Sequence, residues 1–152
     1  MFECVLPNDE ATLAFGNQLA RAVNAEPCII FLRGQLGAGK TTLTRGFLRG
    51  LGYEDKVKSP TFTLVEPYQI DKHIVYHFDL YRVTDPQELI HMGIQDYFTG
   101  DAICLIEWPE LGANLLPTPD ILCELTFEGL GRHITVLSQT QRGEKIVQRV
   151  KQ

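Results

Sequence analysis

The stretch of residues 34–42, GQLGAGKTT, constrains the possible folds of this chain more than any other part of its sequence. It consists of a glycine, four further residues and then Gly-Lys-Thr, which is the pattern of a phosphate-binding loop. The apolar run 28–32 before it predicts a buried parallel strand, and the apolar stripe after it predicts a helix. This context distinguishes a phosphate-binding loop from a glycine-rich turn without a ligand.

Each residue type in the loop has a chemical role. Glycines allow positive φ, so that successive backbone N–H groups can surround an anion, and the start of the following helix adds partial positive charge. We expect Lys40 to reach the β- and γ-phosphate oxygens and the Thr41 hydroxyl to bind Mg²⁺. The predicted ligand-binding residues of the loop are Gly37, Ala38, Gly39, Lys40, Thr41 and Thr42.

Length and composition predict one globular domain spanning residues 1–152. A formal net charge of -5 argues against a protein that grips nucleic acid by itself through phosphate neutralisation. No apolar run approaches the ~20 residues of a membrane span, and the N-terminus lacks the features of a signal peptide. We therefore expect a cytoplasmic protein without membrane contact. The 4 cysteines are far apart, which favours buried, reduced thiols over a zinc site or disulfides.

The remaining patterns predict helices and strands in alternation. A helix is expected from Asn8 or Asp9, either of which can be its N-cap, to about Ala25. Further expected elements are a hairpin formed by a strand ending near residue 68 and a strand at 73–80, a helix starting near residues 84–85, a strand at 102–106, a hairpin of residues 121–127 and 133–137, and a closing helix at 141–150. Together they indicate a compact α/β fold.

Two of the apolar runs end in an acid, Asp79 in one and Glu107 in the other. Ligands of α/β sheets collect at the carboxyl ends of the strands, so both acids are expected near the phosphate-binding loop. Either can hold Mg²⁺ directly or through water, and the other would then orient or deprotonate an attacking water. The structural alternative for each acid is to cap a neighbouring helix.

Three further features have both a functional and a structural interpretation. A hydroxyl of the Ser59-Pro60-Thr61 loop can sense a γ-phosphate as switch segments do, or the loop is an ordinary turn. Trp108 lines a nucleotide cleft or packs in the core. His77 is predicted to share a strand face with Asp79, where it either shuttles a proton or is simply hydrogen-bonded in place.

Five sequence blocks occur in one order along the chain: GAGKTT at 37–42, KSPTFTLV at 58–65, HFDLYR at 77–82, GIQDYF at 93–98 and LIEWP at 105–109. Together they closely resemble the TsaE (YjeE) family, the bacterial ATPase component of tRNA threonylcarbamoyladenosine synthesis. The resemblance covers nearly the whole chain. It implies a single P-loop NTPase domain with a mainly parallel central sheet, flanked by antiparallel strands and helices.

The resemblance also implies an activity and its partners. Members of the family bind ATP or ADP with Mg²⁺ and hydrolyse ATP slowly. They act with the TsaD and TsaB subunits, which place threonylcarbamoyl on adenosine 37 of tRNA, so that tRNA is contacted only indirectly. The expected function is therefore an ATP-driven conformational cycle that acts on the modification complex.

Residue by residue, the resemblance implies Thr41 and Glu107 as metal ligands and Asp79 as the catalytic acid. Thr61 takes the switch-like position, and the predicted catalytic residues are Asp79, Lys40 and Thr61. The residues implied to approach the nucleotide outside the loop are Trp108, Arg132 and Asp9. The chain departs from the family at Gln35, where aspartate is usual.

Two other functions compete with this hypothesis. A small-molecule kinase can use the same loop, but it usually needs an arginine-bearing lid, and no arginine-rich insertion stands out in the sequence. A nucleotide-gated binding module without essential hydrolysis is the other alternative. The sequence lacks the guanine-reading Asn-Lys-x-Asp motif and an Asp-x-x-Gly motif after a strand, which disfavours GTP as its nucleotide.

Overall fold

The computed structural model describes residues 1–152, apart from the side chain of Ala113. Its elements follow one another as β1 (Phe2–Leu6), α1 (Asp9–Val23), β2 (Cys28–Arg33), α2 (Lys40–Gly50), β3 (Val65–Ile70), β4 (His73–Asp79), α3 (Gln87–His91), η1 (Ile94–Phe98), β5 (Ile103–Glu107), η2 (Pro109–Leu111), η3 (Ala113–Leu115), β6 (Ile121–Glu128), β7 (Gly131–Ser138) and α4 (Gln141–Val150), where η marks a 3-10 helix.

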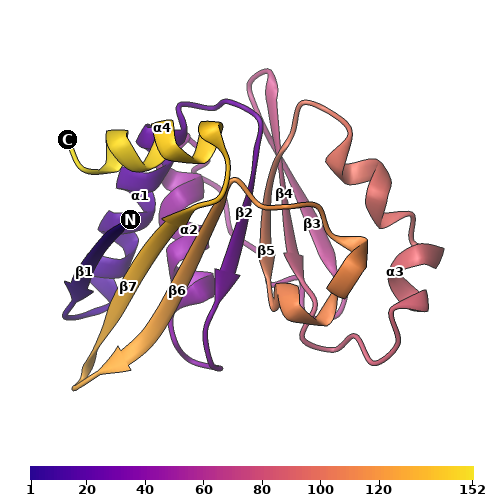
Figure 1. Ribbon diagram of the computed structural model, residues 1–152, viewed down its shortest axis with the longest axis horizontal. Coiled ribbons are helices and arrows are strands. Elements are labelled where there is room, and N and C mark those ends of the chain that lie inside the picture. The colour runs from indigo at the N-terminus through magenta and orange to yellow at the C-terminus, as the bar shows by residue number, and fades with distance from the viewer.

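The strands form one 7-stranded sheet in the order β1-β7-β6-β2-β5-β4-β3. The four central strands β6, β2, β5 and β4 are parallel to one another. Antiparallel pairing adds β3 at one edge and β7 and β1 at the other. The expectation of a mainly parallel sheet with antiparallel flanks is therefore confirmed, and Figure 1 shows the carboxyl ends of the parallel strands at its lower edge.

Most of the predicted elements are present because their signals are local. Asn8 is the N-cap of α1, and its side chain accepts a hydrogen bond from the Ala11 N–H at 2.9 Å. Thr140 caps α4 in the same way. The hairpins β3–β4 and β6–β7 both form, and α1 ends at Val23, slightly before its predicted end.

Besides the 3-10 helices, strand β1 is the element that the sequence did not predict. In the structure it pairs antiparallel with β7, and Phe2 lies opposite Val136. Nothing in five N-terminal residues indicates a partner so far along the chain, so the edge of the sheet is decided by tertiary contact.

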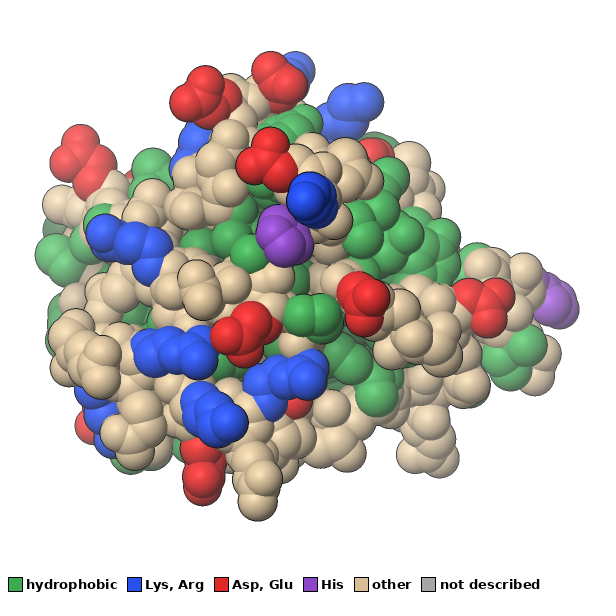
Figure 2. All heavy atoms as spheres, turned by 90° about the horizontal axis from the view of Figure 1, so that it is seen from above, with side chains coloured by type: hydrophobic (Ala, Val, Ile, Leu, Met, Phe, Trp, Pro, Cys, Tyr) green, Lys and Arg blue, Asp and Glu red, His purple; other side chains and the backbone are tan. Residues whose placement is uncertain are grey.

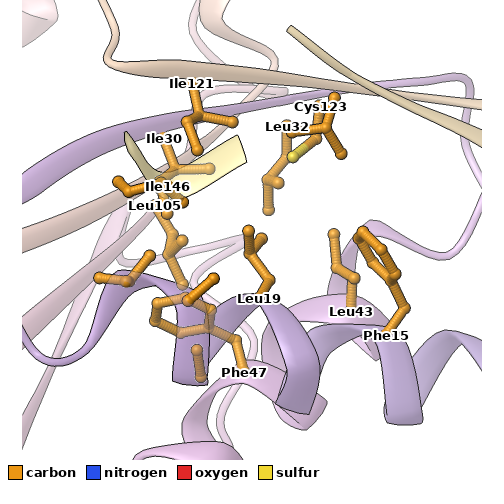
Figure 3. Close-up of a cluster of buried hydrophobic side chains, with 14 of the residues drawn as sticks. Phe15, Leu19, Ile30, Leu32, Leu43, Phe47, Leu105, Ile121, Cys123 and Ile146 are labelled. Atoms are coloured by element: carbon orange, nitrogen blue, oxygen red, sulfur yellow. The ribbon is translucent and has the colours of Figure 1, made fainter. Parts of the chain in front are cut away.

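One face of the sheet is covered by α1, α2 and α4. Figure 3 shows the side chains that fill the space between the sheet and these helices. Leu19 from α1 and Phe47 from α2 are 1% exposed, and Ile30 from β2 is 0% exposed. Burying side chains of this size contributes roughly 1.5–3 kcal/mol each before conformational entropy is counted. The other labelled members of this cluster are Phe15, Leu32, Leu43, Leu105, Ile121, Cys123 and Ile146.

The opposite face over β3, β4 and β5 is covered by α3 and the 3-10 helices, as Figure 1 shows at the right. Tyr97 of η1 packs edge-on against Tyr76 and Phe78, with ring centroids 4.7 and 5.3 Å apart. Along β5, Leu105 joins the cluster under α1 and α2, whereas Ile106 joins the cluster under α3. The strand is therefore buried on both sides, which explains its continuous apolar sequence.

The surface and the cysteines agree with the composition. Acidic and basic side chains are interspersed on the face seen from above in Figure 2, which is the end of the molecule opposite the carboxyl ends of the parallel strands. No described helix combines the length and apolar character that a membrane span requires. Three of the four cysteines are buried, and burial raises the pKa of the Cys104 and Cys123 thiols to about 12.

Glycines let α1 and α2 approach closely, and α2 is the helix that carries the phosphate-binding loop. A Cβ atom at Gly16 would meet the Leu43 carbonyl oxygen and lie 2.7 Å from the Phe47 nitrogen. A Cβ at Gly46 would meet the backbone of Leu13 from the other side. Side chains at these positions would push the two helices apart.

We expect Gly16→Ala to lower the free energy of unfolding by about 1–3 kcal/mol, because the added methyl group overlaps backbone atoms that cannot rotate away. Gly100→Ala is the matched control, since a Cβ there would have no atom within 4 Å. Chemical denaturation of both variants measures the difference. Equal stability of the two variants would contradict the close approach of α1 and α2.

Candidate functional site

The loop between β2 and α2 has the backbone conformation that an anion-binding site requires. Gly37 and Gly39 have φ angles of 80° and 104°, in the region that glycine adopts without strain. Helix α2 begins at Lys40, and in the part of the chain that the structure describes no side chain caps it. The N–H groups of its first turn are therefore left to bind an anion.

Arg132 from β7 holds the backbone of this loop in place. Its guanidinium donates to the Gly37 carbonyl at 2.9 Å and to the Ala38 carbonyl at 3.2 Å, and it stacks on the ring of Phe127 at 4.5 Å. The Ala38 carbonyl and the Gly39 N–H belong to one trans peptide and therefore point in opposite directions. Because the carbonyl accepts a hydrogen bond from Arg132, the Gly39 N–H points away from Arg132. Arg132 thus fixes the direction of one N–H donor of the phosphate-binding loop.

Lys40 is held inside the loop. Its Nζ donates to the carbonyl of Gly34 and lies 3.8 Å from the centroid of the Trp108 ring, and the residue is 5% exposed. Burial lowers the pKa of Lys40, and the nearby charges of Glu107 and Asp79 partly oppose that shift. Trp108 thus packs on the loop lysine, and its backbone has a left-handed φ of 57°, a strained conformation for a tryptophan.

The two strand-end acids lie side by side because β4 and β5 are parallel and in register. Asp79 is the register partner of Glu107. Glu107 is 3% exposed, and its Oε2 lies 3.5 Å from the Thr41 Oγ1 at the start of α2. Three residues far apart in the sequence are therefore brought together, as the strand-end argument predicts.

Asp79 is half-buried, and its Oδ1 accepts a hydrogen bond from the Tyr81 N–H at 3.0 Å. Burial raises the pKa of the Asp79 carboxyl, and the charge of Glu107 raises it further, whereas the Tyr81 N–H lowers it. A carboxylate in this environment takes up a proton more readily than an exposed one. Asp79 is therefore suited to act as a general base.

The oxygen atoms around Thr41 suit Mg²⁺, which prefers carboxylate and hydroxyl ligands. No three His, Cys, Asp or Glu side chains of the described residues form a group that could hold a metal ion by themselves. Mg²⁺ typically takes only one or two protein ligands and completes its shell with water and substrate phosphates. The donor set therefore fits a metal that arrives with a phosphorylated ligand.

All but one of the predicted site residues line one cavity of about 430 Å³. The exception is Ala38, a loop residue that is 0% exposed. Ser59 and Thr61 both line the cavity, and their hydroxyls lie 2.6 Å apart. The predicted residues that line the cavity are Asp9, Gly37, Gly39, Lys40, Thr41, Thr42, Thr61, Asp79, Glu107, Trp108 and Arg132.

Three lining residues were not among the predicted site residues: Leu36 of the loop itself, and Tyr81 and Arg82 after β4. Arg82 stacks on the exposed ring of Phe62 at 4.5 Å, and the Tyr81 ring lies 5.1 Å from that of Trp108. Both belong to the HFDLYR block, and their place directly after a strand-end acid is the signal that could have identified them.

A second cavity of about 480 Å³ lies next to the first and shares Trp108 with it. Gln35 lines this second cavity together with Glu110 and Glu124. Lys40, Thr41 and Asp79 do not line it, so the candidate phosphate-binding, metal-binding and catalytic side chains face the first cavity. The departure of the sequence at Gln35 therefore falls outside the cavity that contains the candidate catalytic groups.

A parallel α/β sheet in which a phosphate-binding loop joins β2 to α2 defines the class of P-loop proteins. The sequence model of the family described as "Threonylcarbamoyl adenosine biosynthesis protein TsaE" matches residues 6–134. The chain therefore belongs to the TsaE family, which confirms the resemblance inferred from the five sequence blocks.

Individual relatives agree with this assignment. A protein of Haemophilus influenzae named "tRNA threonylcarbamoyladenosine biosynthesis protein TsaE" is 47% identical over 146 residues, which cover 93% of this chain and 92% of the relative. A protein of the same name from Bacillus subtilis is 36% identical over 142 residues, with 87% and 88% covered. The crystal structure of YdiB from Bacillus subtilis superimposes with a TM-score of 0.83 at 31% identity, covering 99% of this chain and 93% of that one.

The raised pKa of Asp79 predicts how stability depends on pH without a ligand. While the Asp79 carboxyl is protonated, its burial costs the folded protein little. As the pH rises through the folded-state pKa, the carboxyl ionises and the folded protein loses stability. Asp79→Asn removes this loss and keeps an acceptor for the Tyr81 N–H. We therefore expect its Tm, measured without nucleotide and metal, to exceed that of the wild type at pH 7.5.

The difference should narrow as the pH approaches about 4, near the ordinary pKa of aspartate. Asp71→Asn is the control, because Asp71 is exposed in the β3–β4 turn. A Tm for Asp79→Asn at or below that of the wild type at pH 7.5 would be evidence against the cost of burying this carboxylate.

Proposed function

We propose that this chain binds and hydrolyses ATP with Mg²⁺, and that this cycle supports threonylcarbamoyl modification of adenosine in tRNA. The observation that carries the proposal is the 3.5 Å approach of Thr41 to Glu107 at the start of α2, with Asp79 as the register partner of Glu107. The biological part is supported by membership of the TsaE family and by the names of the relatives from Haemophilus influenzae and Bacillus subtilis.

In this proposal the phosphates of ATP lie against the loop. The Gly39 N–H, which is turned away from Arg132, and the first N–H groups of α2 donate to phosphate oxygens. Lys40 adds a positive charge after exchanging the Gly34 carbonyl for a phosphate oxygen. Thr41 and Glu107 would hold Mg²⁺, which neutralises charge on the phosphates when it is bound.

Hydrolysis requires a water to bond to the γ-phosphorus while the bond to the ADP oxygen breaks. The water must give up a proton, and Asp79 is the proposed acceptor because its environment raises its pKa. Thr61 lines the same cavity and is bonded to Ser59. Its loop is therefore near enough to respond to a γ-phosphate, as switch segments do.

We propose that the cycle acts on the TsaD and TsaB subunits, and on tRNA only through them. The net charge of -5 supports a role that does not include direct tRNA binding, as does the mixture of acidic and basic groups on the face in Figure 2. A protein that grips tRNA alone gains most of its affinity from a basic surface that neutralises phosphates.

Removal of the loop lysine tests nucleotide binding. We expect Lys40→Ala to weaken ATP binding about 10- to 100-fold, because a charge-assisted hydrogen bond to phosphate contributes roughly 1.5–3 kcal/mol. Lys72→Ala is the matched control, since Lys72 is exposed in the β3–β4 turn. Isothermal titration calorimetry with ATP and Mg²⁺ measures both, and equal affinities of the two variants would refute the proposed phosphate contact.

Loss of the proposed base tests the role of hydrolysis. We expect Asp79→Asn to lower the ATPase kcat about 100-fold or more, the usual contribution of a general base, and to stop repeated modification of tRNA by the complex reconstituted with TsaD and TsaB. Asp71→Asn should behave as the wild type in both assays.

Two outcomes would favour the competing functions. Multiple-turnover modification at the full rate by Asp79→Asn, without ATP hydrolysis, would instead support a nucleotide-gated binding module. Transfer of the γ-phosphate to a metabolite rather than to water would support a kinase.

A further inference from the structure

His77 is the buried titratable residue that the proposed mechanism does not use. It lies on β4 with 0% exposure, and its Nε2 is 2.6 Å from the Oε2 of Glu107. Its Nδ1 is buried and has no hydrogen-bond partner among the described residues. A polar ring at such a position requires a physical explanation.

Apolar packing alone does not explain a histidine at this position. His77 lies opposite Leu105 in the β4–β5 ladder, and Val75 and Ile103 form the pair that precedes it on the same face. An aliphatic side chain would fill this space without the desolvation cost of an imidazole. The hydrogen bond to Glu107 is the one interaction here that only a polar side chain can make.

The unpartnered Nδ1 indicates which ring nitrogen carries the proton. An N–H group at Nδ1 would be a buried donor without an acceptor, which is costly. The proton therefore lies on Nε2, which donates to the Glu107 carboxylate, and Nδ1 stays bare. Glu107 is thereby the acceptor of this hydrogen bond, and carboxylate oxygens are the ligands that a divalent cation such as Mg²⁺ prefers.

The bond fixes the position of one carboxylate oxygen. Oε2 of Glu107 accepts from His77 Nε2 on the buried side and lies 3.5 Å from Thr41 Oγ1 on the side of the cavity. A glutamate carboxylate that is held at one oxygen loses the rotational freedom about its last bond. His77 itself does not line the cavity, which argues against a proton shuttle and favours the hydrogen-bonded alternative.

We propose that His77 is a positioning residue that holds Glu107 in the orientation in which it binds Mg²⁺ together with nucleotide. The inference rests on the proposed function, because it assumes that Glu107 is a metal ligand. Residues that orient metal ligands through hydrogen bonds typically change metal affinity 10- to 100-fold when they are replaced.

The test compares variants that keep or remove the donor at the place of Nε2. His77→Gln puts an amide N–H close to the position of Nε2, whereas the shorter amide of His77→Asn cannot reach Glu107 and His77→Leu has no donor. His73→Leu is the control, because His73 is exposed at the other end of β4. The measurements are Mn²⁺ binding in the presence of ADP by electron paramagnetic resonance, and ADP affinity with Mg²⁺ and with EDTA.

We expect Mn²⁺ affinity to fall 10- to 100-fold in His77→Leu and His77→Asn, and less than threefold in His77→Gln and His73→Leu. ADP affinity in EDTA should stay the same in all variants that melt cooperatively. A purely structural role would instead change both affinities together. If His77→Leu does not fold, the comparison of His77→Gln with His77→Asn still tests whether a donor at the place of Nε2 is needed for metal binding.

Two results would overturn the inference alone. The first is wild-type Mn²⁺ affinity in His77→Leu or His77→Asn, and the second is an equal loss in His77→Gln and His77→Asn. A wild-type protein whose ADP affinity does not depend on Mg²⁺ would refute the proposed function and this inference together. If only the inference about His77 fails, ADP affinity depends on Mg²⁺ in the wild type and depends on it equally in the His77 variants.

Discussion

The parallel pairing of β2 with β5 and of β5 with β4 is the constraint on which the candidate site depends. It sets Leu32 opposite Glu107 and Glu107 opposite Asp79, so that both acids end at the edge where the loop begins. A shift of one residue would turn Glu107 to the other face, away from Thr41. The register is maintained because β5 is packed on both faces, with Leu105 under the helices α1 and α2 and Ile106 under α3.

The same pairing concentrates charge in a partly buried space. Burial lowers the pKa of Lys40 and raises that of Asp79, because a low-dielectric surrounding disfavours the charged form of each. Trp108 adds a left-handed backbone directly after Glu107. These features cost stability in the absence of a ligand and are tolerated because the core on both faces of the sheet is well packed.

Two side chains position the groups that face the cavity. Arg132, which also lines the cavity, donates to the carbonyls of Gly37 and Ala38, and His77, which does not line it, is hydrogen-bonded to Glu107. Neither contact is visible in the spacing of the sequence. For Arg132 the family resemblance implied an approach to the nucleotide, and the structure adds hydrogen bonds to the loop backbone. For His77 the sequence left open a shuttle or a bond, and burial favours the bond.

The sequence by itself determined the features whose causes are local. These are the phosphate-binding loop, the start of the first helix at Asn8 or Asp9, both hairpins and the acids that end two apolar runs. Only the tertiary structure decided that β1 pairs with β7, that Trp108 packs on Lys40 and that His77 reaches Glu107. The physical reason is that strand partners and cross-strand contacts depend on which faces are buried together, which no local pattern encodes.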